Sequence, residues 1–101
     1  MIHVVVRVML KKNMAPVFLR IFRELATVVR QEPGCLDYFP TKDVDCKLSD
    51  QEMHHDTITV VEKWSNKADL ERHLRSGHMR SFHERTKDIV LDTRMTITEE
   101  V

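Results

Sequence analysis

Hydrophobic and polar residues alternate in four stretches of the chain, and such alternation is typical of β-strands. In the first stretch, Ile2 to Leu10, both sets of alternate positions carry apolar residues. A strand of this kind must be covered on both sides, and in so short a chain a second subunit is one source of that cover. The other three stretches are Cys35 to Phe39, where Pro40 ends regular pairing or marks an edge strand, Thr57 to Trp64, and Ile89 to Ile97.

Apolar residues three and four positions apart predict a helix between the first two strands. They recur from Met14 to Val29, and Asn13 is a suitable N-cap for this segment. Pro33 and Gly34 follow and end the helix, because proline removes a backbone donor and glycine accepts the left-handed conformation of a helix exit.

Two shorter helical segments are predicted between Trp64 and the last strand. Ser65 can cap the first segment, and the break at Gly77 separates it from a second that covers about His78 to Asp88. The polar stretch Thr41 to Asp56 is interpreted as a loop.

The predicted order is strand, helix, strand, strand, helix, strand, which is the split βαβ arrangement of ferredoxin-like α+β domains. The 101 residues suit one domain, with residues 1–101 sharing a single core. A four-stranded antiparallel sheet then carries its helices on one face only. We expect the other face to find its apolar cover in a homodimer, by pairing with a twofold-related copy.

The composition narrows the classes of partner. The 16 basic and 16 acidic residues give a formal charge of zero, and no basic run is long enough to favour nucleic acid. The first apolar stretch is interrupted by His3 and Arg7, so we expect neither a membrane span nor a signal sequence. We therefore expect a cytoplasmic protein.

Cys35 and Cys46 lack the spacing of a zinc knuckle or a disulfide framework. With only two glycines the chain has no phosphate-binding loop, and we expect no nucleotide cofactor.

One charged residue breaks the apolar pattern of the third strand. Glu62 lies at an alternate position between Val60 and Trp64, on the face expected to be buried. A buried carboxylate needs a partner such as Arg7 or Arg94, or else it is protonated more easily than usual.

Three histidines follow this strand and are the other candidates for chemistry. His73, His78 and His83 are each five positions apart, which on one continuous helix turns successive side chains by about 140°. That spacing is poor for chelation, although a break at Gly77 could bring the rings together, and we expect no bound metal. His73 and His83 fall at inward positions and can act as acid or base, or can equally be core histidines bonded to the backbone. His78, at a helix start, is expected near the surface or the pocket mouth.

Three motifs occur in a fixed order: EPGCLDYFP (Glu32 to Pro40), VEKW (Val61 to Trp64) and LERHLRSGHMRSF (Leu70 to Phe82). With these motifs the sequence resembles the antibiotic biosynthesis monooxygenase superfamily, and within it the small bacterial quinol monooxygenases. The resemblance implies a homodimeric α+β barrel with a pocket between the sheet and the helices of each subunit. It also implies oxidation of a small electron-rich aromatic substrate, a quinol or phenol, by molecular oxygen without metal or flavin.

The resemblance assigns expected roles to the candidate residues. His73 or His83 would be the catalytic base, and Glu62 would orient or polarise it. The residues expected to bind the substrate in the pocket are Trp64, Phe22, Tyr38, His78 and Phe82.

Other activities of the superfamily fit less well or remain open. Heme degradation is not expected, because Val6 and His73 stand where the heme-degrading members have asparagine and tryptophan. One alternative is an isomerase of a small phosphorylated signalling metabolite, for which Arg7, Arg80 or Arg94 would hold the phosphate. The other is a dimeric ligand-binding or sensor domain without catalytic activity.

Overall fold

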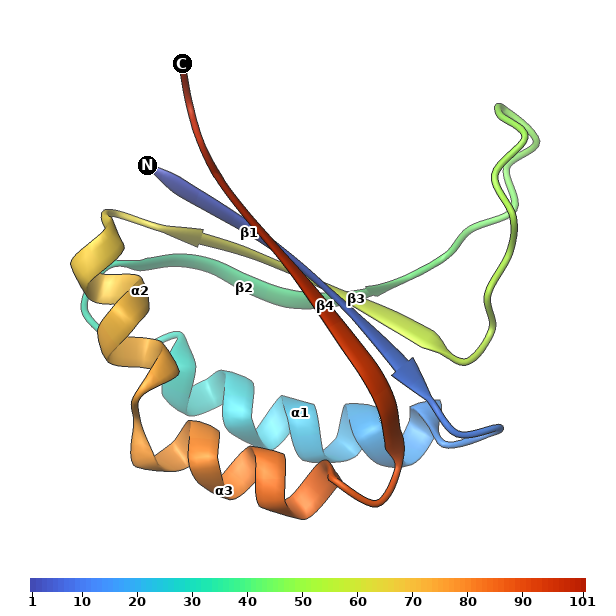
Figure 1. Cartoon of the computed structure of the whole chain (residues 1–101), viewed down its shortest axis with the longest axis horizontal. Helices are drawn as coiled ribbons and strands as arrows, with labels where there is room; N and C mark the ends of the chain where they lie inside the picture. Colours follow the sequence, from blue (N-terminus) through green and yellow to red (C-terminus); the bar gives the residue numbers. More distant parts are fainter.

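The computed structural model describes residues 1–101 and contains four strands and three helices. Their order confirms the predicted ferredoxin-like α+β fold, with the second helix divided in two at Gly77 (Figure 1). The elements are β1 (Ile2–Leu10), α1 (Ala15–Val29), β2 (Cys35–Lys42), β3 (Thr57–Trp64), α2 (Lys67–Leu74), α3 (Gly77–Thr86) and β4 (Val90–Glu99).

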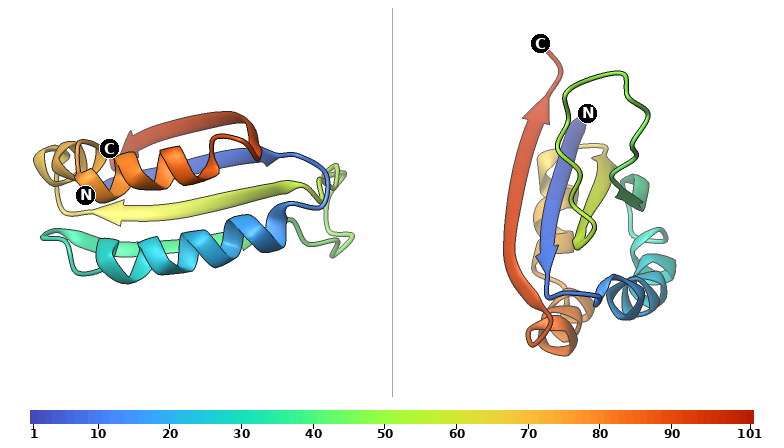
Figure 2. Two further views of the ribbon diagram at one scale, coloured as in Figure 1. Left: turned by 90° about the horizontal axis from the view of Figure 1, so that it is seen from below. Right: turned by 90° about the vertical axis from the view of Figure 1, so that its right-hand side faces the viewer.

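The four strands form one antiparallel sheet in the order β2-β3-β1-β4. Figure 2 shows α1 and α3 side by side on one face of this sheet. Pro40 pairs with Val60 and lies on the edge strand β2, where its missing N–H costs no ladder bond. The strand therefore continues to Lys42, and of the two interpretations of Pro40 the edge strand is correct.

The core lies between the sheet and α1, and aromatic rings tie its parts together. Phe22 of α1 stacks on Tyr38 of β2, with ring centroids 5.2 Å apart and an interplanar angle of 11°. Phe82 of α3 meets Phe22 edge-on at 6.1 Å. Burial of each such ring contributes about 1.5–3 kcal/mol, so this cluster holds α1, β2 and α3 in fixed relative positions.

Two helix caps differ from the sequence-based prediction. Asn13 does not cap α1: it adopts a left-handed conformation (φ 64°), and its backbone N–H donates to Asp56 Oδ1 at 3.0 Å. Asparagine tolerates this conformation better than most residues, so here it forms the turn after β1. The N-cap of α2 is Asn66 rather than Ser65, because Asn66 Oδ1 accepts a hydrogen bond from the Asp69 N–H at 2.9 Å.

The face of the sheet away from the helices has an apolar centre. One register row across it contains Phe39, Val61, Val5 and Thr96. Val5 and Phe39 are 41% and 40% exposed, so this row is open to solvent in the single chain. None of the three helices is both long and apolar enough to cross a membrane.

Candidate active site

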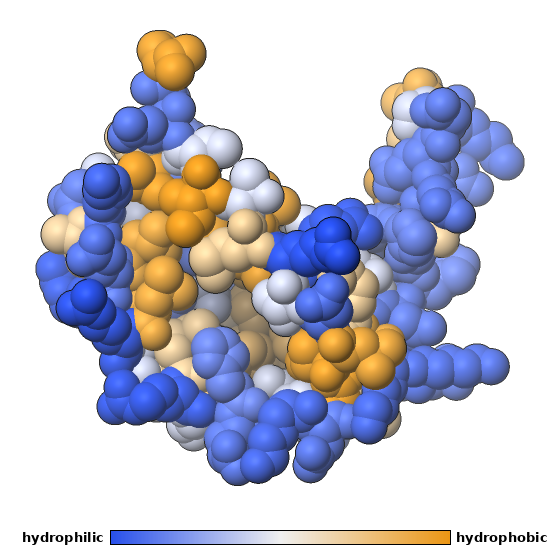
Figure 3. Space-filling view, viewed as in Figure 1, coloured by the Kyte–Doolittle hydropathy of each residue, from blue (hydrophilic) through white to orange (hydrophobic).

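A cavity of about 240 Å³ lies between the sheet and the helices. In the space-filling view it appears as a hollow with apolar side chains on its rim (Figure 3). Its wall is formed by 16 residues, of which 11 are hydrophobic. The apolar part of this wall includes Val6, Val8, Val60, Phe18, Phe22, Leu74, Met79, Phe82, Val90 and Met95.

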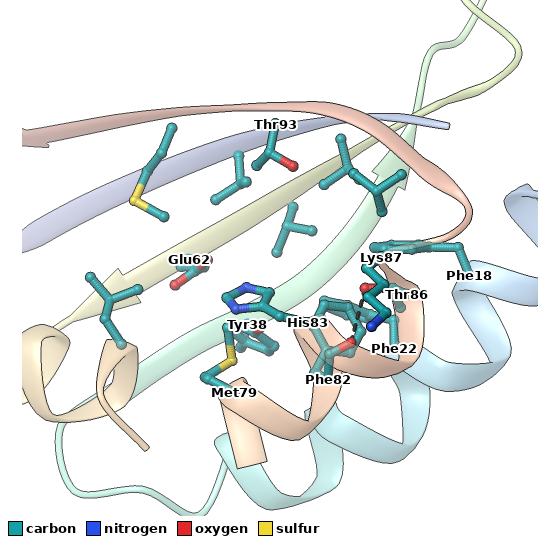
Figure 4. A pocket seen from close by; sticks show the side chains of 16 residues that line it. Phe18, Phe22, Tyr38, Glu62, Met79, Phe82, His83, Thr86, Lys87 and Thr93 are labelled. Atoms are coloured by element: carbon teal, nitrogen blue, oxygen red, sulfur yellow. Dashed lines mark hydrogen bonds between the residues drawn. The ribbon is translucent and has the colours of Figure 1, made fainter. Parts of the chain in front are cut away.

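Two ionisable side chains enter this apolar space from opposite walls. Glu62 comes from β3 in the sheet, and His83 comes from α3 (Figure 4). Tyr38 and Lys87 also line the cavity. A mostly apolar space with a few convergent polar groups is the usual form of a small-molecule site.

Glu62 is held by the residue two positions along the same strand. It is only 5% exposed, and the indole Nε1–H of Trp64 donates to its Oε1 at 3.0 Å. Burial raises the pKa of Glu62 to about 7, the Trp64 hydrogen bond opposes this rise, and the negative charge of Glu32 adds to it. The carboxyl group therefore exchanges its proton near neutral pH.

The predicted arginine partners of Glu62 are absent. Arg7 on β1 and Arg94 on β4 occupy directly opposite positions in the sheet register. Their side chains point to the face of the sheet opposite to that of Val6 and Glu62. The prediction of an ion pair with either arginine is thus wrong, and the stated alternative of easier protonation is correct.

His73 lies behind Glu62 and does not line the cavity. It is 1% exposed, and its ring centroid is 4.7 Å from that of Trp64 and 5.4 Å from that of Tyr38. Its Nδ1 is 3.2 Å from Glu32 Oε1, while its Nε2 has no hydrogen-bond partner and is 4.0 Å from Glu62 Oε1. Burial lowers the pKa of His73, against the raising effect of Glu32, so the ring favours its neutral form.

Glu32 was not among the candidate site residues from the sequence, where it was named only as the first residue of the EPGCLDYFP motif. Its Oε1 contacts both His73 Nδ1 and His78 Nε2. Gly34 makes the tight turn beside it possible: its φ is +81°, and a Cβ there would be 2.0 Å from Asp69 Oδ2. The EPG segment thus places a carboxylate between two helices.

The predicted site residues fall into two groups. Five line the cavity: Glu62, His83, Phe22, Tyr38 and Phe82. Three do not: His73 and Trp64 are buried behind Glu62, and His78 lies beside Glu32 on the outer side. Their roles in catalysis or binding remain predictions.

The ligand atoms of Glu32, His73 and His78 lie within 4.8 Å of one another. Two imidazoles and a carboxylate are ligands that zinc accepts, and the helix break at Gly77 brings these two histidines together. The same carboxylate oxygen can also accept hydrogen bonds from both rings, which completes the cluster as a hydrogen-bonded group.

Cys35 lies near this cluster but is a poor nucleophile. Burial and the charges of Glu32 and Glu62 raise the pKa of its thiol to about 11. The Sγ–H donates weakly to the Asp37 carbonyl at 3.8 Å. Cys35 instead packs against the hydrophobic core as a small, partly buried side chain.

A family model and a curated protein both match this chain over more than three quarters of its length. The family model described as antibiotic biosynthesis monooxygenase matches residues 1–85. A protein of Escherichia coli K12 named probable quinol monooxygenase YgiN is 35% identical over 78 residues, which are 77% of this chain and 75% of that protein.

Solved structures share the fold at lower sequence identity. A putative antibiotic biosynthesis monooxygenase from Nitrosomonas europaea superposes with a TM-score of 0.85 at 15% identity, covering 100% of this chain and 99% of that one. Protein PA3566 of Pseudomonas aeruginosa gives a TM-score of 0.82 at 20% identity, with coverage of 99% and 93%. At these identities the likeness concerns the fold alone.

Proposed function

The chain belongs to the antibiotic biosynthesis monooxygenase family, and we propose that it is a cofactor-independent monooxygenase of a small electron-rich aromatic substrate, a quinol or phenol. The observation that carries this proposal is a buried carboxyl group with a pKa of about 7 in a mostly apolar cavity with aromatic side chains in its wall. The probable quinol monooxygenase YgiN, similar over three quarters of its length, supports the substrate class.

The dimensions of the cavity suit a flat ring system. An apolar cavity of about 150 Å³ binds benzene, so a volume of about 240 Å³ admits one or two fused rings. The side chains of Phe22, Tyr38 and Phe82 offer aromatic surfaces on which such rings can pack. We therefore favour benzene- or naphthalene-sized quinols over larger polycyclic compounds.

Glu62 is the group best placed to take a proton from a phenolic hydroxyl. It lines the cavity, whereas His73 lies behind it. This reverses the division of roles expected from the sequence, in which a histidine was the base and Glu62 supported it. His83 faces the same space from α3 and is a second candidate to bind or protonate an oxygen of the substrate.

Removal of the proton makes the substrate a stronger reductant. A phenolate in a cavity that excludes water can pass electrons to dioxygen, and the protein contributes orientation, a proton acceptor and exclusion of solvent. One oxygen atom then enters the ring, and the other takes up two protons and leaves as water. A hydroquinone and dioxygen thereby give a hydroxyquinone and water.

We also propose that the chain acts as a homodimer. The row of Phe39, Val61 and Val5 on the uncovered sheet face supports this, because a second sheet would remove these side chains from water. The partner that covers this face of the sheet is proposed to be a second copy of this chain.

The alternative of a phosphate-ester isomerase receives no support from the cavity. Arg7, Arg80 and Arg94 do not line it, and Lys87 is the only lysine or arginine that does. A mostly apolar wall is also a poor environment for a phosphate dianion.

The proposal is tested by oxygen uptake with a panel of benzene and naphthalene hydroquinones, corrected for uptake without protein. We expect uptake that depends on both substrate and protein and that falls strongly in Glu62→Gln. His55→Ala is the matched control, since His55 is exposed in the turn before β3 and does not line the cavity. No uptake with any hydroquinone would refute the proposal, and stabilisation of the fold by these compounds without turnover would favour a ligand-binding domain.

A further inference from the structure

The two ring nitrogens of His73 have different surroundings. Nδ1 faces the Glu32 carboxylate at 3.2 Å, and Nε2, buried and without a partner, faces Glu62 at 4.0 Å. A carboxylate can only accept a hydrogen bond, so the nitrogen facing Glu32 carries the proton. The neutral ring then has its lone pair on Nε2, on the side of the cavity.

We propose that Glu32 and His78 are positioning residues that hold His73 in this Nδ1–H tautomer, so that Nε2 shares the proton that Glu62 takes from the cavity ligand. This inference rests on the proposed function in one respect only, the identity of the ligand as a proton donor. The arrangement resembles a catalytic triad, in which a carboxylate fixes the tautomer of a histidine and the histidine exchanges a proton with a third group. Here these three groups are Glu32, His73 and Glu62.

The proton balance is simple. A hydroxyl group of the ligand loses a proton to the Glu62 carboxylate and becomes an anion. The proton is then held between Glu62 and His73 Nε2, and any positive charge on the imidazole is offset by Glu32 on its other side. The 4.0 Å separation exceeds a hydrogen bond, and such contacts commonly shorten when a ligand binds.

His78 gives Glu32 its fixed position. Its Nε2 contacts the same Oε1 that faces His73, and it is attached to the start of α3 rather than to α2. Glu32 is therefore held from two helices as well as by its own turn at Gly34. A carboxylate held in this way cannot rotate freely from Nδ1, which is what a fixed tautomer requires.

The charged and titratable groups around His73 come from several elements. They are Glu62 on β3, Tyr38 on β2, Glu32 before β2, and His78 and His83 on α3. Burial raises the pKa of Tyr38, so it remains a neutral phenol, and burial lowers that of His73. The lowered pKa agrees with a His73 ring that is neutral when no ligand is bound, with its lone pair on Nε2.

The tautomer can be measured without any substrate. Long-range ¹H–¹⁵N spectra of histidine-labelled protein at about pH 8 distinguish a protonated from a bare ring nitrogen. We expect His73 to show Nδ1–H and a bare Nε2 in the wild type. In Glu32→Leu, which offers no acceptor, we expect the proton to move to Nε2, toward Glu62; His78→Ala should give a mixture. A wild-type ring protonated on Nε2, or no change in Glu32→Leu, would overturn the proposal, and the wild-type spectrum decides even if a variant does not fold.

Turnover gives the second readout. Glu32→Leu is expected to lower kcat by about tenfold or more with little change in KM, because the ligand does not touch Glu32. The control is Glu24→Gln, which removes an exposed carboxylate from α1. An altered tautomer with unchanged kcat would overturn the catalytic part of the inference. A correct tautomer in a wild-type protein that oxidises no hydroquinone would instead refute the proposed function and leave the positioning of His73 intact.

Discussion

Trp64 and Glu62 lie on the same face of β3, and the indole Nε1–H of Trp64 donates a hydrogen bond to Glu62 Oε1 at 3.0 Å. Both side chains are buried, at 0% and 5% exposure. The alternation of a β-strand places residues two apart on one face, so the local sequence alone brings the donor to the carboxyl group. The interaction favours the ionised form of a group that burial would otherwise keep protonated.

The first prediction concerns pH and stability. The pKa of Glu62 is raised from an ordinary value of 4.5 to about 7, so between these values the folded state binds more protons than the unfolded state. The free energy of unfolding therefore falls as the pH rises from about 4.5 to about 7 and then levels off. The contribution of Glu62 is about 3 kcal/mol over this window.

Urea unfolding of wild type and Glu62→Gln across this range isolates the effect, because both proteins contain the same His73. The stability of the wild type relative to the variant should decrease with rising pH. A constant difference between the two proteins would show that Glu62 titrates normally.

A second prediction addresses the tryptophan itself. Trp64→Phe removes the hydrogen bond that lowers the pKa of Glu62, so this pKa should rise above about 7. The smaller ring also leaves space in the core, and we expect a loss of about 1–3 kcal/mol in unfolding free energy. A ¹³C titration of the Glu62 carboxyl group measures the first effect. An unchanged titration midpoint would mean that the indole does not stabilise the carboxylate.

The third prediction uses the two glycines as a matched pair. Gly34→Ala introduces a Cβ into the space of the Asp69 side chain at a position with φ +81°, and should destabilise the fold by about 1–3 kcal/mol. Gly77→Ala is the control, because its nearest contact would be 3.6 Å away and it lies in the first turn of α3. Thermal unfolding compares them, and equal stability of the two variants would contradict the close approach at Gly34.

The fourth prediction concerns the uncovered face of the sheet. If a second copy covers it, the wild type should sediment with twice the mass of the chain, and Val5→Asp should shift it toward the monomer by placing a charge in the interface. Glu84→Lys, on the exposed surface of α3, serves as a control for a general change in charge. A wild-type protein that sediments as a monomer at all concentrations would refute the homodimer.

Sequence periodicity predicted the elements well because each has a clear apolar face. The prediction was accurate for α1, and the alternation in β3 correctly identified Glu62 as a carboxylate on the buried side. The positions of the caps were less predictable, since Asn13 and Asn66 can serve as either cap or turn residue, and tertiary contacts such as that between Asn13 and Asp56 decide between these uses.

The site could be predicted only in part. The inward helical position correctly predicted that His73 is buried, but periodicity does not show depth, and His73 lies behind the cavity rather than in its wall. His83 lines the cavity but is exposed on α3. Glu32 could not be found, because its contacts join residues 41 and 46 positions apart along the chain. Its neighbours Pro33 and Gly34 gave a strong turn signal that accounted for the segment without any role for the carboxylate.

The central claim, that Glu62 is the proton acceptor of an apolar oxygenation site, is tested most directly by the pH dependence of kcat/KM for hydroquinone-dependent oxygen uptake. We predict that kcat/KM rises with an apparent pKa near the value of about 7 for Glu62, and that in Glu62→Gln this step disappears together with most of the activity. A Glu62→Gln variant that retains wild-type kcat/KM and the same pH profile would contradict the account.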